Sequence, residues 1–246
     1  MTVEPLLAVR ELRKTYGKAV ALSGVSFTLH SAGTLGLVGS SGSGKSTLAR
    51  CLAGFESPTS GEIRFAGSRY EAQLIFQQPA ASLNPRFTAA EIVEEPLLIQ
   101  RRGTPAERRE RSAAALELVG IARSALDKRA HQFSGGERQR LAIARSLVLE
   151  PRLLILDESF NGLDPSLTAQ ISALLVELQQ RLALTYILIS HDLELVRGLA
   201  TEIAVMEHGC LVEHAPTAVL MSAPQHPRTR ELIAATLALS ARGRTE

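Results

Sequence analysis

The sequence predicts an α/β fold with an inserted helical segment. Three unbroken apolar runs are typical of parallel strands buried on both faces, and they lie at 34–38, 153–156 and 186–189. The first run leads directly into a glycine-rich loop and then a helical pattern. From about 82 to 150 the pattern is helical, so we expect an α-helical subdomain inserted into a core made of 1–81 and 151–240.

Short apolar runs separated by turn residues predict further strands. Residues 6–29 are expected to form antiparallel strands with turns at 16–18 and 23–24. Further strands are expected at 62–65 and 73–76, and a hairpin at 203–206 and 210–213.

Capping patterns mark the helices. A helix is expected over 45–53, closed by Gly54. Ser-x-x-Glu or Thr-x-x-Glu patterns at Thr104 and Ser134 start two helices, of which the first runs to Gly120 and the second ends before Pro151. Asp164-Pro165 and Asp192 begin two more, and 241–246 is expected to be frayed.

Composition excludes several classes of protein. The 246 residues carry a formal charge of +2, which neither demands nor excludes a nucleic-acid partner. With only 4% aromatic residues, stacking platforms for single strands are scarce, and we expect no nucleic-acid partner. Two distant cysteines, Cys51 and Cys210, fit a reducing cytoplasm and no metal cluster. The N-terminus lacks the pattern of a signal peptide, and no uncharged apolar run is long enough to cross a bilayer.

A phosphate-binding loop is the strongest motif. Residues 39–46 match G-x-x-x-x-G-K-[ST] between a buried strand and a helix. Backbone N–H groups of such a loop converge on phosphate oxygens, while Lys45 reaches the β- and γ-phosphates and Ser46 binds Mg²⁺. The expected ATP-binding residues in this segment are Gly39, Ser40, Ser41, Gly42, Ser43, Gly44, Lys45, Ser46 and Thr47.

Polar residues at the ends of other strands extend the predicted site. Asp157 follows a buried strand, from which its carboxylate can reach Mg²⁺, and Glu158 can act as general base on water. Gln77 and His191 also follow strands, at the edge where α/β sheets bind ligands. Ser134-Gly135-Gly136 is either an ordinary capped helix start or a second anion-binding helix N-terminus.

With Phe133-Ser-Gly-Gly-Glu-Arg-Gln-Arg140 the chain resembles the nucleotide-binding subunits of ATP-binding cassette (ABC) transporters over nearly its whole length. The resemblance implies a P-loop NTPase (RecA-like) core with an N-terminal antiparallel β subdomain and an inserted α-helical subdomain. It implies that Tyr16 stacks on adenine and that Gln77 is the Q-loop glutamine, with a catalytic and a Mg²⁺-binding role. It also implies that the signature consists of Ser134, Gly135, Gly136 and Glu137. Asp157 and Glu158 would be the Walker B pair, Asp164 the D-loop aspartate and His191 the catalytic switch histidine.

The resemblance also implies partners. Two such subunits, identical or different, pair head to tail, so that each ATP lies between one phosphate loop and the other subunit's signature. ATP hydrolysis is coupled to integral membrane permease subunits. A periplasmic or extracellular substrate-binding protein delivers the substrate to these subunits and is therefore an indirect partner. The subunit is then cytoplasmic and peripheral on the inner face of the cell membrane.

Two segments indicate a subfamily. Residues 76–86 and 224–229 are similar to runs in the ATPases of dipeptide, oligopeptide and nickel importers. An importer for peptides, nickel or metal chelates is therefore the leading hypothesis. An accessory ATPase of a soluble phosphonate-cleavage complex is the alternative, and a P-loop kinase is disfavoured by the signature and by Glu158.

Some residues depart from the family pattern. Ser159-Phe160-Asn161-Gly162 stands where the family usually has Pro-Thr-Ser-Ala, so D-loop contacts across the dimer are expected to differ. Glu137 replaces the usual signature glutamine and suits a helix N-terminus, but it brings negative charge near the nucleotide. None of these changes removes a phosphate, metal or water ligand, so activity is expected.

Overall fold

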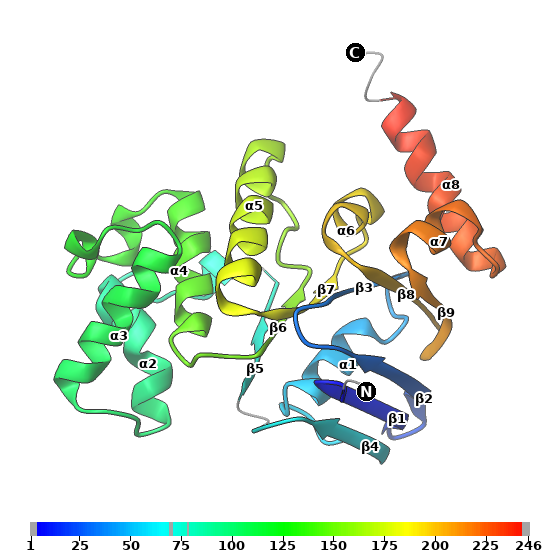
Figure 1. The fold of residues 1–246 in the computed structure, drawn as a ribbon, viewed down its shortest axis with the longest axis horizontal. Helices are drawn as coiled ribbons and strands as arrows, with labels where there is room; N and C mark the ends of the chain where they lie inside the picture. Colours follow the sequence, from blue (N-terminus) through cyan, green and yellow to red (C-terminus); the bar gives the residue numbers. More distant parts are fainter. Residues whose placement is uncertain (1–3, 69–70, 78, 243–246) are drawn as a thin grey trace.

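The structure is a computed structural model that describes residues 4–68, 71–77 and 79–242. Two sheets and a group of helices make up the molecule (Figure 1). The smaller sheet has the order β2-β1-β4 and is antiparallel, as the sequence predicts for residues 6–29. Its strands are β1 (Leu7–Tyr16), β2 (Ala19–Leu29) and β4 (Ser60–Phe65).

One predicted turn of this sheet is wrong. The turn at 16–18 joins β1 to β2, whereas Ser23 and Gly24 lie inside β2, where the register shifts. Gly24 has φ +87°, and Glu11 on the facing strand has φ +46°. A bulge of this kind lets the strand bend without ending, because glycine adopts a positive φ at little cost.

The larger sheet positions the candidate site. Its order is β5-β6-β7-β3-β8-β9, and only β9 runs antiparallel to its neighbour. The first and last residues of each strand differ by at most one or two positions from the predicted ones, except that β9 continues further than predicted. The strands are β3 (Thr34–Gly39), β5 (Ala72–Ile75), β6 (Leu153–Asp157), β7 (Thr185–Ile189), β8 (Glu202–Glu207) and β9 (Cys210–Pro216). The carboxyl ends of β5, β6, β7 and β3 therefore meet at one edge.

Alternating side chains of the central strands build two cores. Leu153 and Ile155 of β6 pack with α1 (Lys45–Leu52) and the smaller sheet. Leu154 and Leu156 pack on the opposite face, where α5 (Pro165–Leu182) and α6 (Leu193–Leu199) lie (Figure 1). Burial on both faces explains why these strands read as continuous apolar runs.

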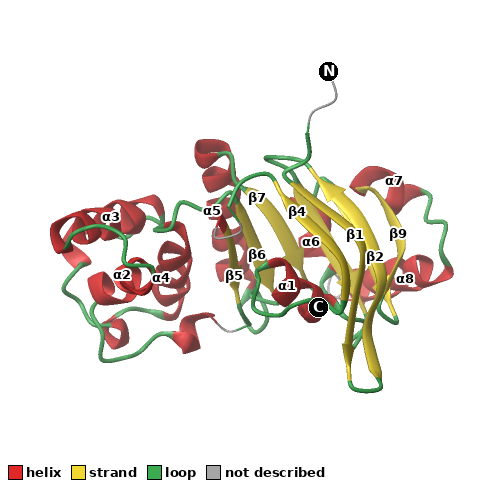
Figure 2. Cartoon of the chain, turned by 90° about the horizontal axis from the view of Figure 1, so that it is seen from below, coloured by secondary structure: helices red, strands yellow, loops and turns green. Residues whose placement is uncertain are grey.

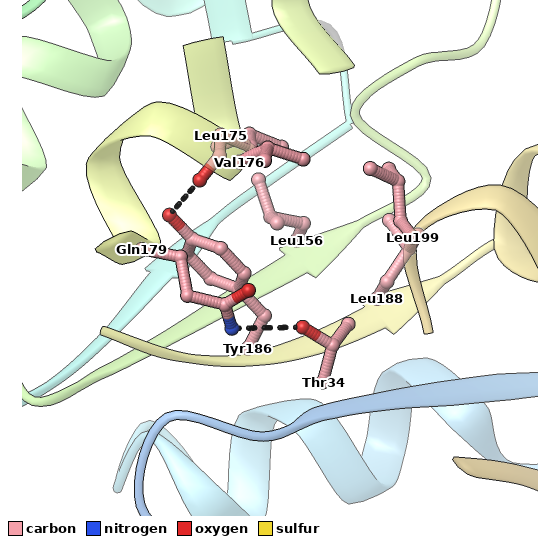
Figure 3. Close-up of a pocket in the computed structure, with 8 residues that line it drawn as sticks. All are labelled: Thr34, Leu156, Leu175, Val176, Gln179, Tyr186, Leu188 and Leu199. Carbon is pink, nitrogen blue, oxygen red and sulfur yellow. Dashed lines mark hydrogen bonds between the residues drawn. The ribbon is translucent and has the colours of Figure 1, made fainter. Parts of the chain in front are cut away.

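Two polar contacts hold α5 on the sheet (Figure 3). The hydroxyl of Tyr186 donates to the carbonyl oxygen of Leu175 over 2.9 Å, and Gln179 Nε2 lies 3.0 Å from Thr34 Oγ1. The space beside these side chains is ≈ 10 Å³, and burial raises the pKa of Tyr186. A cavity of this size holds about one water molecule, so it is a packing feature and no nucleotide site.

The helical segment lies to one side of the sheets (Figure 2). Its main helices are α2 (Ala89–Ile99), α3 (Pro105–Leu118) and α4 (Gly135–Leu147), with short 3₁₀ turns at Pro79–Ser82, Arg123–Ala125 and Ala130–Gln132. Both predicted capping boxes are present, and α2 has a third at Thr88. The buried residues of these helices belong to the same core as the α5 face of the sheet.

Two C-terminal helices are absent from the sequence prediction. They are α7 (Thr217–Ser222) and α8 (Pro227–Arg242), so the expected fraying at 241–246 falls partly on α8 and partly outside the described residues. The Glu213 carboxylate accepts the N–H groups of Gln225 and His226 at 2.8 and 2.9 Å and fixes the entry to α8. In the part of the chain that the structure describes, no helix has the length and apolar content needed to cross a bilayer.

Candidate nucleotide site

The glycine-rich loop between β3 and α1 has the backbone that a phosphate loop needs. Gly39, Gly42 and Gly44 have φ values of +154°, +77° and +104°. A Cβ atom at Gly39 would lie 2.2 Å from the carbonyl oxygen of Met206, and one at Gly44 would lie 2.5 Å from that of Ala21. Only glycine fits at these two positions, and the resulting path leads into the N-terminus of α1.

Lys45 is folded back into the loop. Its side chain is 5% exposed, and Nζ donates to the carbonyl oxygens of Gly39 and Ser40, both at 2.9 Å. Burial lowers the pKa of Lys45, against the charges of Glu158 and Asp157, which raise it. The ammonium is therefore already stripped of much of its water and held where an anion would gain most from it.

Ser46 and Asp157 come together from α1 and β6. The Ser46 hydroxyl donates to Asp157 Oδ1 over 3.1 Å, and Asp157 is 6% exposed. Burial raises the pKa of this carboxyl, against the hydrogen bond from Ser46. A hydroxyl and one carboxylate fit Mg²⁺, which takes few protein oxygens and completes its shell with water and phosphate. Among the described residues no group of three or more His, Cys, Asp or Glu side chains forms a metal cage.

Glu158 lines the same pocket as the loop. This open pocket of ≈ 300 Å³ is bounded by Glu158, Ala21 and residues of the loop and the start of α1. The backbone N–H of Glu158 donates to the carbonyl oxygen of Ile189 on β7 over 3.0 Å. The phosphate loop, the oxygens of Ser46 and Asp157, and the carboxylate of Glu158 thus lie close together. This closeness is expected from their positions after β3 and β6.

Gln77 and His191 occupy the same sheet edge. Both are exposed, Gln77 after β5 and His191 after β7. His191 lines a neighbouring pocket of ≈ 320 Å³ together with Asn161 and Ser190. Their predicted roles, water contact and Mg²⁺ binding for Gln77 and switching for His191, stay predictions.

Tyr16 ends β1 near α1. Its hydroxyl donates to the Glu56 carboxylate, which raises the pKa of Tyr16 and lowers that of Glu56. The ammonium of Lys14 lies 5.0 Å from the centre of the ring. The ring is exposed, so stacking on adenine stays a prediction.

The residues expected to form the signature lie at the N-terminus of α4. Ser134 Oγ accepts the N–H of Glu137 at 3.2 Å, and the Glu137 carboxylate accepts the N–H of Ser134 at 2.8 Å. That second bond lowers the pKa of Glu137. A Cβ atom at Gly136 would lie 2.9 Å from Leu167 Cδ1, at the start of α5 that Asp164 caps by accepting the N–H of Leu167 at 2.9 Å. Ser134, Gly135 and Asp164 are exposed and free to face another molecule.

Comparison with known proteins decides the family. The family model described as ABC transporter matches residues 22–161. The dipeptide transport ATP-binding protein DppF of Haemophilus influenzae is 44% identical over 239 residues, which cover 92% of this chain and 73% of that protein. The chain belongs to the ABC transporter family. It is an ATP-binding ATPase of that family.

Solved ABC proteins have the same fold. CbiO1 from Clostridium perfringens, part of the ABC transporter complex CbiONQ, matches with a TM-score of 0.78 and 30% identity over 90% of this chain and 96% of that one. The ATP-binding cassette MJ0796, solved as a dimer bound to ADP and phosphate, matches with a TM-score of 0.73 and 27% identity over 86% of this chain and 98% of that one.

Two polar contacts of this ABC ATPase escaped the sequence analysis. Gln139 Nε2, buried on α4, donates to the carbonyl oxygen of Ser159 over 2.9 Å. Asn161 Nδ2 donates to Glu158 Oε2 over 2.8 Å. Glutamine on a helix and asparagine in a turn are both common, so the residue types gave no sign of these contacts. Only the spacing of three residues between Glu158 and Asn161 indicated that their side chains could meet.

Replacing Asp157 with asparagine is expected to stabilise the nucleotide-free ABC ATPase. The variant removes a carboxylate whose ionised form burial disfavours, while its amide oxygen can still accept from Ser46. We expect the Tm to rise by about 2–4 °C at neutral pH, the usual size of the effect of one stabilising substitution in a domain of this length. The pKa of Asp157 is raised in the fold, so the gain is full above that pKa and shrinks as the pH falls toward 3.8. Thermal melts of the native chain and the variant across this pH range measure the difference in Tm. A difference that does not change with pH would contradict the prediction.

Replacing Glu137 with glutamine is expected to favour the ATP-bound dimer. The Glu137 carboxylate stays negative at neutral pH at the N-terminus of α4, which the second ATP is expected to approach. A glutamine retains the cap through its amide oxygen and removes the charge. We expect about threefold tighter ATP-dependent dimerisation at low salt and a smaller gain at high salt. Sedimentation measures this, with Glu117→Gln on α3 as control, and equal dimerisation at both salt concentrations would contradict it.

Proposed function

We propose that this chain is the ATP-hydrolysing subunit of an ABC importer for peptides. One observation carries the hydrolytic part: Glu158 lines the pocket of the phosphate loop, beside the contact between Ser46 and Asp157. The relatives support the cargo class. DppF of Haemophilus influenzae is named for dipeptide transport, and a 44% identical Brucella ovis protein is named a putative peptide import ATP-binding protein.

The proposed chemistry is attack of water on the γ-phosphorus of ATP. Glu158 accepts a proton as the new P–O bond forms, and the bond between the β–γ bridging oxygen and the γ-phosphorus breaks to give ADP and phosphate. Lys45 holds the β- and γ-phosphates, and His191 contacts the γ-phosphate at the sheet edge. Mg²⁺ would be held by Ser46 and Asp157, with Gln77 nearby, and would neutralise phosphate charge when bound.

The second half of each site comes from another ABC ATPase subunit, identical or different. The exposed Ser134 and Gly135 at the N-terminus of α4 suit the γ-phosphate of ATP held by the other subunit, because helix N-termini attract anions. Asp164 and the D-loop would contact the partner beside them. The helical segment 82–150 then acts as the signature-bearing subdomain. MJ0796 was solved as a dimer bound to ADP and phosphate, which supports the pairing of two such subunits.

Integral membrane permeases are the partners that an importer requires, with a substrate-binding protein outside the membrane acting indirectly. The ATPase would sit in the cytoplasm against the inner face of the membrane. The names of the relatives favour peptides over nickel or metal chelates and do not favour a soluble phosphonate-cleaving complex.

Affinity purification from detergent-solubilised membranes tests this function. We expect two permease subunits to be recovered with the tagged chain, and peptide-loaded binding protein to stimulate ATP hydrolysis in vesicles that contain the complex. Recovery of a soluble enzyme complex without any integral membrane protein would overturn the importer. Stimulation by nickel-loaded but not by peptide-loaded binding protein would overturn the cargo class.

A further inference from the structure

A tight turn follows β6 and carries Glu158. The backbone N–H of Asn161 donates to the carbonyl oxygen of Glu158 over 3.1 Å and closes the turn. Its side-chain amide also reaches back, with Nδ2 2.8 Å from Glu158 Oε2. The same two residues are thus joined twice, once through the backbone and once through the side chains.

The backbone of Glu158 is fixed from outside the turn. Glu158 has φ +49°, a left-handed conformation that costs a side-chain-bearing residue about 1–2 kcal/mol. Two contacts keep it there: the bond from its N–H to Ile189 on β7, and the bond from Gln139 on α4 to the carbonyl oxygen of Ser159. The part of Glu158 that remains to be placed is its side chain, which has three rotatable bonds.

A general base works only if its oxygen meets the water in the right place. A carboxylate has two oxygens, so one can be held by a donor while the other accepts a proton. We propose that Asn161 is a positioning residue, which holds Glu158 Oε2 and leaves Oε1 for the attacking water. The proposal rests on the general-base role of Glu158 in the proposed function.

The surroundings of Asn161 favour this role. Asn161 is half-buried, and it lines a pocket with Ser190 and His191. The family usually has serine here, whose hydroxyl is one atom closer to the backbone than the asparagine amide. The amide therefore extends the reach of the turn to the carboxylate at the position where the sequence departs from the family.

Two substitutions separate positioning from packing. Asn161→Ala is expected to lower kcat about tenfold and to leave the KM for ATP unchanged, because the pocket of the loop is untouched. Asn161→Asp has the size of the native residue but lacks the N–H donor and repels Glu158, so its kcat is expected to be lower still. If Asn161 only filled space, Asp would act like the native residue and Ala would be worse, and this rank order would overturn the proposal.

A double-mutant cycle tests the pair directly. In a Glu158→Gln background, the single-turnover rate of ATP hydrolysis is expected to be the same with and without Asn161→Ala. An equal loss in both backgrounds would show that Asn161 acts elsewhere and would overturn the positioning role alone. If Glu158→Gln left turnover unchanged, the general-base role would fail, and the positioning role with it. ATP binding and thermal melts establish that each variant is folded.

Discussion

Replacing Glu158 with glutamine is expected to lower kcat for ATP by about 10²–10⁴-fold, the usual contribution of a general base. Glutamine keeps the size of the side chain, and its amide oxygen can still accept from Asn161, but it cannot take the proton of water. The loop, Lys45 and Ser46 are unchanged, so ATP is expected to bind. We therefore expect an ATP-bound dimer to accumulate.

The measurements are steady-state hydrolysis and sedimentation with ATP and Mg²⁺. Glu117→Gln makes the same chemical change on an exposed position of α3 and is expected to leave both unaltered. Normal turnover in Glu158→Gln would remove Glu158 as the base. Loss of ATP binding in Glu158→Gln would mean that the substitution had disturbed the nucleotide pocket. It would contradict a role for Glu158 that is confined to the hydrolysis step.

Replacing Lys45 with methionine is expected to weaken ATP binding at least about a hundredfold, which corresponds to the loss of about one or two charge-assisted hydrogen bonds. Methionine has nearly the length of lysine but no donor. It would also leave the carbonyl oxygens of Gly39 and Ser40 without the ammonium that lies 2.9 Å from each. The loop would then lose both its cation and an internal tie.

Binding of a fluorescent ATP analogue checks this expectation. Lys18→Met, at an exposed position of the turn between β1 and β2, is the matched control and should bind as the native chain does. An affinity for ATP within threefold of the native value in Lys45→Met would contradict the role assigned to the ammonium. A thermal melt without nucleotide separates loss of binding from loss of the fold.

Local chemistry made most of the fold predictable. Strands such as β6 read as unbroken apolar runs because both of their faces are buried, and helices such as α4 carry their own caps. Where the local signal was ambiguous, prediction failed. Gly24 resembled a turn because glycine allows both a turn and a bulge, and only the pairing of β2 with β1 selects the bulge. Among the described side chains of α8, Thr229 and Ile233 are buried. The start of the helix is fixed by Glu213 on β9, which lies 12 and 13 residues before its partners Gln225 and His226.

The family, the loop at 39–46 and the identity of the residues at the strand ends could all be predicted from the order of the amino acids alone. These follow from spacing along the chain, because a phosphate loop is a continuous segment between one strand and one helix. Which of those residues touch is visible only in the folded chain: Ser46 contacts Asp157, 111 positions away, while Gln77 and His191 remain exposed. Contacts of this kind depend on the strand order. In the sheet only β7 lies between β3 and β6, although the two strands are far apart in the chain. The hold of Asn161 on Glu158 likewise depends on a left-handed backbone that β7 and α4 maintain.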